Sequence, residues 1–92
     1  MVVRLAHWLR GRTVPAQPRH RLLLGASIRE YRKARKLTQE KLAELASLHP
    51  NYIGEVERGE KTISIDALLR IADAMRVALS TLVFEIDRSR KV

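Results

Sequence analysis

The sequence predicts an all-α protein, a bundle of five helices preceded by a basic N-terminal arm. From Leu22 onward, apolar residues recur at intervals of three and four, which is the period of a helix. Hydrophobic residues make up 46% of the chain and aromatic residues only 4%, so the core is aliphatic, as suits a helical bundle. Helix-capping residues and a glycine divide this periodic stretch into short helices, and no strand pattern competes with them.

The length of the chain bounds its organisation. A chain of 92 residues has room for one domain with a small core. We expect an arm and linker over 1–21, a helical domain over 22–86 and a polar tail over 87–92. Cysteine is absent, which excludes a disulfide framework and a thiolate metal site. We therefore predict no metal and no cofactor, and stability that comes from packing alone.

Residues 1–21 differ in composition from the rest of the chain. They contain five arginines and no acidic residue, and Pro15 and Pro18 argue against a single helix through them. We expect a short helical turn over 2–9 and an extended linker over 13–20. The arm is a disordered segment, an over-extended start of translation or a functional segment.

The first two helices of the domain are predicted over 22–36 and 39–46. Thr38 lies at the start of the second one, where its hydroxyl can accept a hydrogen bond from a free backbone N–H group. The residues that share one face are Leu24, Ile28, Arg32 and Arg35 in the first helix and Leu42, Ala43 and Ala46 in the second.

The third helix is predicted over 50–58. Proline is well suited to the first turn of a helix, and Pro50 lies there. Gly59 follows the last turn, where a left-handed glycine commonly ends a helix. His49 directly precedes the helix and is better explained as its cap than as a catalytic base.

The fourth helix begins after Ser64, its predicted cap, and a fifth is predicted over about 79–85. Asp66 lies in the first turn of the fourth helix, where a negative charge favours the helix dipole. Ile63 and Leu68 have the spacing of a hydrophobic staple. The expected buried positions of the fourth helix are Ile65, Leu68, Leu69, Ala72 and Met75. The fifth helix carries the apolar residues Leu79, Leu82, Val83 and Phe84.

The second and third helices form a predicted helix-turn-helix, because only one tight connection fits between them. On a helical projection of the third helix, Asn51, Glu55 and Arg58 fall on one face. Ile53 and Val56 fall on the opposite face. The apolar face anchors the helix to the bundle, so the polar face points outward.

The outward residues have the chemistry of DNA recognition. Asn51 can pair with adenine through two hydrogen bonds, and Glu55 can accept one from the cytosine amino group. Arg58 at the end of the helix suits a phosphate, as does Gln39 at the N-terminus of the preceding helix. Gly54 borders this face and allows another surface to approach closely.

Glu57 projects toward the core side of the third helix, where a carboxylate needs a cation. Arg32 lies on the apolar face of the first helix and needs an anion, so we predict a partly buried ion pair between the two. The alternative is that Arg32 reaches out to water and Glu57 lies at the rim of the core.

Residues 22–86 resemble the Cro/lambda-repressor-like helix-turn-helix domains, which form the XRE family of bacterial and phage regulators. The resemblance rests on Ile-Arg-Glu-Tyr-Arg at 28–32, Leu-Thr-Gln-Glu-Lys-Leu-Ala at 37–43, Tyr-Ile-Gly-Glu-Val-Glu-Arg-Gly at 52–59 and Ile-Ser-Ile-Asp-Ala-Leu at 63–68. The short five-helix form and the segment Leu-His-Pro-Asn-Tyr-Ile look most like the controller proteins of restriction–modification systems and similar compact regulators.

The resemblance implies a transcriptional regulator that binds pseudo-palindromic double-stranded DNA as a homodimer. It also implies roles for particular side chains. These are base contacts at Pro50, Asn51, Gly54 and Glu55; phosphate contacts at Thr38, Gln39, Tyr52, Arg58 and Lys61; a structural bridge between Arg32 and Glu57; and a dimer surface at Leu79, Leu82, Val83, Phe84 and Ile86.

The sequence departs from the family pattern in two places. The family often has glycine at the end of the fourth helix and serine or threonine as the cap of the fifth. Arg76 and Ala78 occupy those positions here. We therefore expect either a less sharply stopped corner between the two helices or two helices that run on differently, which bears on the dimer surface.

The net charge of +8 and the isoelectric point of about 10.9 favour a polyanionic partner, nucleic acid before an anionic membrane surface. No apolar run approaches membrane-spanning length, and residues 1–12 lack the continuous apolar stretch of a signal peptide. We expect a cytoplasmic protein.

Three other functions compete with transcriptional regulation. An antitoxin would repress its own operon through the helix-turn-helix while the arm or the fifth helix binds a toxin. A membrane-surface role for residues 1–12 would use Trp8 and the arginines. Catalysis is not expected, because His7, His20 and His49 are scattered and no nucleophile–base arrangement stands out. If the arm is functional, it contacts DNA backbone or minor groove, or packs on a partner subunit.

Overall fold

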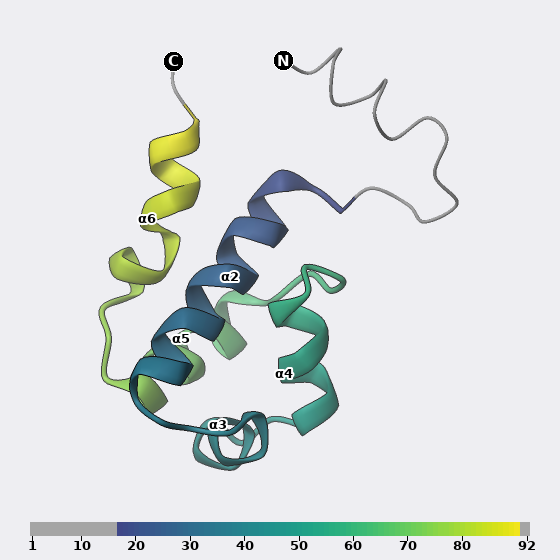
Figure 1. The fold of residues 1–92 in the computed structure, drawn as a ribbon, viewed down its shortest axis with the longest axis vertical. Helices are drawn as coiled ribbons and strands as arrows, with labels where there is room; N and C mark the ends of the chain where they lie inside the picture. Colours follow the sequence, from purple (N-terminus) through teal and green to yellow (C-terminus); the bar gives the residue numbers. More distant parts are fainter. Residues whose placement is uncertain (1–16, 91–92) are drawn as a thin grey trace.

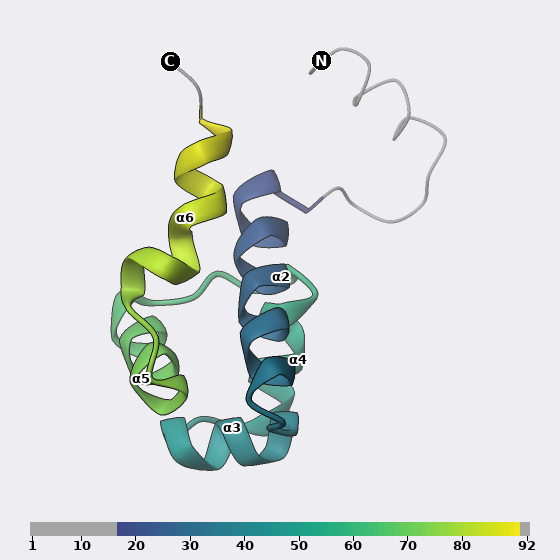
Figure 2. The ribbon, with the colours of Figure 1, turned by 60° about the vertical axis from the view of Figure 1, so that its left-hand side comes forward.

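Helices joined by short connections make up residues 17–90, the part of the chain that the computed structural model describes (Figure 1). They are α2 (Arg19–Ala34), α3 (Gln39–Ala46), α4 (Pro50–Glu57), α5 (Ile65–Met75) and α6 (Leu79–Ser89), with no strand among these residues. α2 packs against both α4 and α6, and α3 packs against α4 and α5 across one end of the bundle (Figure 2). The predicted all-α fold is confirmed.

The first helix starts earlier and ends earlier than predicted. α2 begins at Arg19 rather than Leu22, because Pro18 lies at its N-cap and its carbonyl accepts hydrogen bonds from the N–H groups of Arg21 and Leu22. Proline ahead of a helix needs no N–H partner there, so the helix can start directly after it. Residues 19–21 therefore belong to the helix and not to the linker. The predicted turn at 2–9 and the rest of residues 1–16 lie outside the described residues.

Side-chain caps begin three of the helices as predicted. Thr38 Oγ1 accepts a hydrogen bond from the Lys41 N–H at 2.9 Å, and Ser64 Oγ accepts one from Ala67 at 3.0 Å. His49 Nδ1 accepts from the Asn51 N–H at 3.0 Å, which fixes the first turn of α4. The helix-turn-helix is therefore delimited by local hydrogen bonds that its own sequence supplies.

The corner between α5 and α6 is sharp, in contrast to the expectation. Arg76 adopts a left-handed conformation (φ 57°) and ends α5 without a glycine, as Ser47 does for α3. Arg35 donates a hydrogen bond from Nε to the Met75 carbonyl at this helix end, while its guanidinium lies 5.6 Å from the centre of the Tyr31 ring. A cation at a helix C-terminus is favourable, so Arg35, the C-cap residue of α2, stabilises this corner.

α6 is longer than predicted, and Ala78 precedes it without a side-chain cap. It continues to Ser89, so Asp87–Ser89 are helical rather than part of a frayed tail. Arg88 supports this last turn through an ion pair with Glu85 at 2.8 Å. None of the helices in residues 17–90 combines the length and the apolar character needed to cross a membrane.

The buried face of α5 is shifted from the predicted one. Ile65 and Leu69 are 63% and 41% exposed, whereas Ile71 and Ala67 are buried. α5 carries apolar residues on two neighbouring faces, and its packing against α3 and α6 selects one of them. The buried cluster of the bundle consists of Leu24, Ile28, Leu42, Ala43, Ala46, Ile53, Val56, Leu68, Ile71, Ala72, Met75 and Leu82.

Gly25 sets the distance between α2 and the C-terminal turn of α4. A Cβ atom at this position would lie 2.4 Å from the Val56 carbonyl oxygen and 2.5 Å from that of Glu57. Only glycine permits such a close approach of two backbones. The sequence patterns gave no prediction for Gly25, because nothing in a helical period marks which residue meets a neighbouring backbone.

Candidate DNA-binding surface

α4 has a buried apolar face and an outward polar face. Ile53 and Val56 are 0% and 2% exposed, whereas Asn51 and Arg58 are exposed and Glu55 is half-buried. The end of the helix is defined as well as its start. Gly59 (φ 77°) donates to the Val56 carbonyl at 3.0 Å, and the Glu60 N–H donates to the Glu55 carbonyl at 2.9 Å, which is a Schellman motif.

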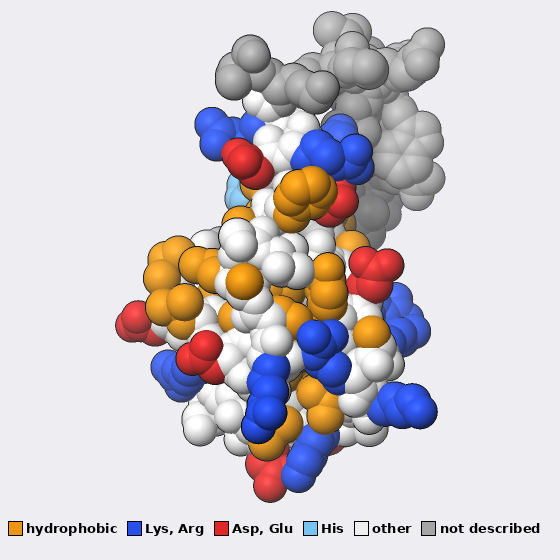
Figure 3. Space-filling view, turned by 90° about the vertical axis from the view of Figure 1, so that its left-hand side faces the viewer, with side chains coloured by type: hydrophobic (Ala, Val, Ile, Leu, Met, Phe, Trp, Pro, Cys, Tyr) orange, Lys and Arg blue, Asp and Glu red, His pale blue; other side chains and the backbone are white. Residues whose placement is uncertain are grey.

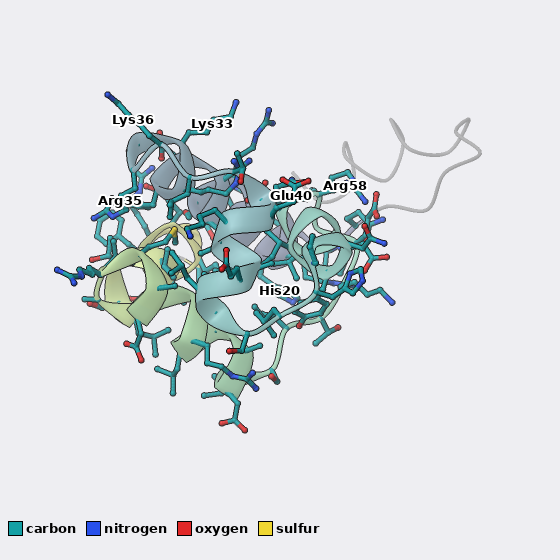
Figure 4. The ribbon with its side chains drawn as sticks, turned by 90° about the horizontal axis from the view of Figure 1, so that it is seen from below. His20, Lys33, Arg35, Lys36, Glu40 and Arg58 are labelled. Carbon is teal, nitrogen blue, oxygen red and sulfur yellow. The ribbon has the colours of Figure 1, made fainter. Side chains whose placement is uncertain are left out.

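A hollow of about 330 Å³ lies between the outward face of α4 and the N-terminus of α3. All four predicted base-contact residues line it, together with the predicted phosphate ligands Gln39 and Arg58. Viewed from below, Arg58 at the C-cap of α4 and Glu40 of α3 lie on the same side of the molecule (Figure 4). The residues that line the hollow are Gln39, Glu40, Pro50, Asn51, Gly54, Glu55 and Arg58.

Gly54 is buried beneath side chains of this same surface. A Cβ atom there would lie 3.1 Å from Arg58 Nη1 and 3.4 Å from Gln39 Oε1. The close approach expected at this glycine is therefore made by Gln39 and Arg58. Glycine leaves these two side chains room to lie together over the middle of the helix.

Arg32 and Glu57 are brought together beneath α4. Arg32 donates from Nε to Glu57 Oε2 at 2.6 Å and from Nη2 to Oε1 at 3.0 Å, and the two side chains are only 10% and 3% exposed. The alternative, with Arg32 in water and Glu57 at the rim, is not what the structure has. The hydrogen bonds that Arg32 donates to the Glu57 carboxylate raise the pKa of Arg32 above its ordinary value.

The ion pair extends to a predicted phosphate ligand. Gln39 donates from Nε2 to Glu57 Oε1 at 3.0 Å, and Arg32 donates from Nη1 to the Leu37 carbonyl at 2.8 Å. α2, α4 and the start of α3 are therefore joined by one hydrogen-bonded group. The Gln39 side-chain amide has a second proton, so Gln39 can still donate a hydrogen bond to a ligand at the N-terminus of α3.

The other predicted phosphate ligands lie outside the hollow. Thr38 is exposed and its hydroxyl is engaged as the cap of α3. Tyr52 is half-buried and donates from its hydroxyl to the Thr62 carbonyl at 3.4 Å, in the loop that also carries the exposed Lys61.

Two charged residues near this surface were missed by the sequence reasoning. Arg29 of α2 lines a second hollow, of about 250 Å³, together with Gln39 and Arg58. Arg29 and Lys33 are four residues apart on an exposed face of α2, and this spacing is the signal by which the sequence could have indicated a basic surface there. Glu60 is the second: its carboxylate accepts from Arg58 Nε at 2.9 Å and from Nη2 at 3.2 Å. This contact raises the pKa of Arg58 and lowers that of Glu60.

The predicted dimer surface on α6 needs one correction. Leu82 is 0% exposed and belongs to the core of the protomer, because it lies on the face that packs against α2 and α5. Leu79, Val83 and Ile86 are partly buried, and Phe84 is 57% exposed. Hydrophobic side chains are visible on the face formed by α5 and α6 (Figure 3). In residues 17–90, no three histidine, aspartate or glutamate side chains are grouped so as to hold a metal ion.

Comparison with known proteins agrees with this geometry. Residues 28–82 match the helix-turn-helix family HTH_3. The chain is 38% identical over 60 residues to the control protein C.SmaI of Serratia marcescens, covering 65% of this chain and 71% of that one. It is 40% identical over 58 residues to the control protein C.BamHI of Bacillus amyloliquefaciens, covering 62% and 72%. The restriction-modification controller protein C.AhdI from Aeromonas hydrophila superposes with a TM-score of 0.67 and 37% identity, covering 67% of this chain and 94% of that one.

Proposed function

Because this chain belongs to the HTH_3 helix-turn-helix family of DNA-binding transcription regulators, we propose that it binds a pseudo-palindromic operator as a homodimer, with α4 in the major groove. The observation that carries the proposal is the outward face of α4, whose polar residues surround a hollow while its apolar face is fixed in the core.

Base recognition is assigned to the outward face of α4. Asn51 is exposed and has a donor and an acceptor for one adenine edge, whereas Glu55 has only acceptors and suits the cytosine amino group. Each such pair discriminates against a wrong base by roughly 1–3 kcal/mol. Pro50 and Gly54 complete the surface without competing polar groups.

Backbone binding is assigned to groups on either side of α4. The N-terminus of α3 presents free N–H groups and Gln39 to a phosphate, and Arg58 and the exposed Lys61 supply positive charge at the other end. The net charge of +8 favours the encounter with DNA at any sequence. These contacts place the helix, and the base contacts select the operator.

The contact with a second copy of the chain is assigned to α6. Phe84 is exposed beside a hollow of about 260 Å³ between α2 and α6, and Leu79, Val83 and Ile86 are only partly covered within one protomer. Two copies related by a twofold axis can cover these residues mutually, and they then present two α4 helices to two half-sites. Phe84→Asp is expected to give a monomer in sedimentation equilibrium, with the helical content unchanged.

Selection of bound sequences from a random DNA pool tests the proposal. We expect a pseudo-palindrome whose half-sites lie about one helical turn apart. If the selected pool contains no motif and binding is only general and salt-sensitive, the sequence-specific function is wrong. If a single half-site is selected instead, the homodimer is wrong and the role of α4 stands.

A further inference from the structure

We infer that Glu60 restrains DNA binding by holding the phosphate-binding guanidinium of Arg58, so that an operator must displace a carboxylate that the protein itself supplies. This inference rests on the proposed function and names a regulatory residue of the same surface.

The Arg58–Glu60 contact occupies the Nε–Nη2 edge of the guanidinium, an edge that can bind a phosphate through two hydrogen bonds. Both Nε and Nη2 donate to the two carboxylate oxygens, at 2.9 and 3.2 Å. The remaining nitrogen, Nη1, lies over Gly54. A second bidentate partner therefore cannot bind Arg58 through Nε and Nη2 until Glu60 leaves. The paired charges also cancel, which reduces the attraction of this end of α4 for DNA.

The backbone holds Glu60 in this position. Its N–H group donates to the Glu55 carbonyl at 2.9 Å, and its own carbonyl accepts from Arg21 Nη1 at 3.3 Å. Gly59, in its left-handed conformation, turns the chain so that residue 60 follows the end of α4 directly. The helix stop thus fixes the backbone of residue 60 beside Arg58, while the exposed carboxylate stays free to exchange partners.

Stability gives no reason for a carboxylate at this position. The side chains of Arg58 and Glu60 are 58% and 43% exposed, and exposed pairs add little to folding free energy. A negative charge just beyond a helix C-terminus is also unfavourable for the helix dipole. Competition with phosphate is the consequence that remains, because Arg58 also lines the hollow at the outward face of α4.

The test compares binding of one random-sequence duplex and of the selected operator by the full chain, Glu60→Gln, Arg58→Ala and the double variant. Removing the competing charge in Glu60→Gln should tighten binding of both duplexes about fivefold at low salt. This ratio corresponds to the interaction of two unit charges at contact distance in water. For Glu60→Gln, the slope of log affinity against log salt concentration should also steepen, by at most about the amount that one additional phosphate contact contributes. The melting temperature should not change.

Two comparisons decide whether the gain acts through Arg58. Asp73→Asn removes an exposed negative charge from α5 and controls for net charge alone. In the Arg58→Ala background, Glu60→Gln should increase the affinity for DNA no more than Asp73→Asn does. An unchanged or weaker affinity for Glu60→Gln overturns the inference, as does an equal gain with and without Arg58. If the unaltered chain binds neither duplex, the proposed function fails and the inference fails with it.

Discussion

Two arginine–glutamate pairs with the same bidentate hydrogen bonds lie at the same end of α4, and they differ in burial. Arg32–Glu57 is buried beneath the helix, and its carboxylate also accepts a hydrogen bond from Gln39. Arg58–Glu60 is exposed beyond the helix end. The first pair is shielded from water and ions, so it can fix geometry. The second is open to solvent and to ligands, so it can exchange partners. Burial, more than the chemistry of the charges, separates a structural pair from a replaceable one.

The largest effect is expected at the buried pair. Glu57→Ala leaves Arg32 as a buried cation without its anion, which should cost roughly 3–5 kcal/mol of unfolding free energy. Chemical denaturation followed by circular dichroism measures this loss. Glu60→Ala is the matched control at the exposed pair and should leave the chemical denaturation curve unchanged. Equal effects of the two substitutions would show that burial does not distinguish the pairs.

A smaller effect is expected where α2 meets α4. Gly25→Ala forces a methyl group against two carbonyl oxygens, and overpacking of this kind costs about 1–3 kcal/mol. Gly54→Ala is the control, because there the nearest atoms belong to flexible side chains and alanine gains up to about 1 kcal/mol in helix propensity. Thermal melts of both variants should therefore move in opposite directions. A Gly25→Ala variant as stable as the parent would contradict the close backbone contact.

How far the sequence could predict this molecule depends on how local each signal is. The caps at Thr38, His49 and Ser64 and the stop at Gly59 act within a few residues, so they located the helix-turn-helix correctly. The buried face of α5 and the burial of Leu82 depend on neighbouring helices. A period of apolar residues cannot choose between two apolar faces, and this is why Ile65 and Leu69 were misplaced.

Charged residues show the same limit. The pairing of Arg32 with Glu57 could be predicted, because each lies on an apolar face where an unpaired charge is costly. The pairing of Arg58 with Glu60 could not, because two exposed side chains can equally well face water. The left-handed Arg76 was also unpredicted, because glycine normally marks such a stop and Arg35 supports this corner from another helix.

The smallest effect concerns acid titration of the exposed pair. Arg58 lowers the pKa of Glu60 below its ordinary value of 4.5. The ion pair therefore contributes its small share of stability above pH 4.5, and this share is lost as the pH falls through the lowered pKa. Arg58→Ala should return the pKa of Glu60 toward 4.5, as measured by NMR titration of its side-chain carbonyl carbon. An unchanged titration midpoint would contradict the ion pair in solution.

Base discrimination by Asn51 tests the central claim most directly. The measurement is the affinity of the chain and of Asn51→Ala for the selected operator and for operators changed at one base pair in each half-site. We predict that Asn51→Ala loses preference at one base pair per half-site and keeps it elsewhere, whereas Gln39→Ala weakens binding of all the operators alike. If Asn51→Ala instead keeps the full preference at every base pair, α4 does not read the operator as proposed.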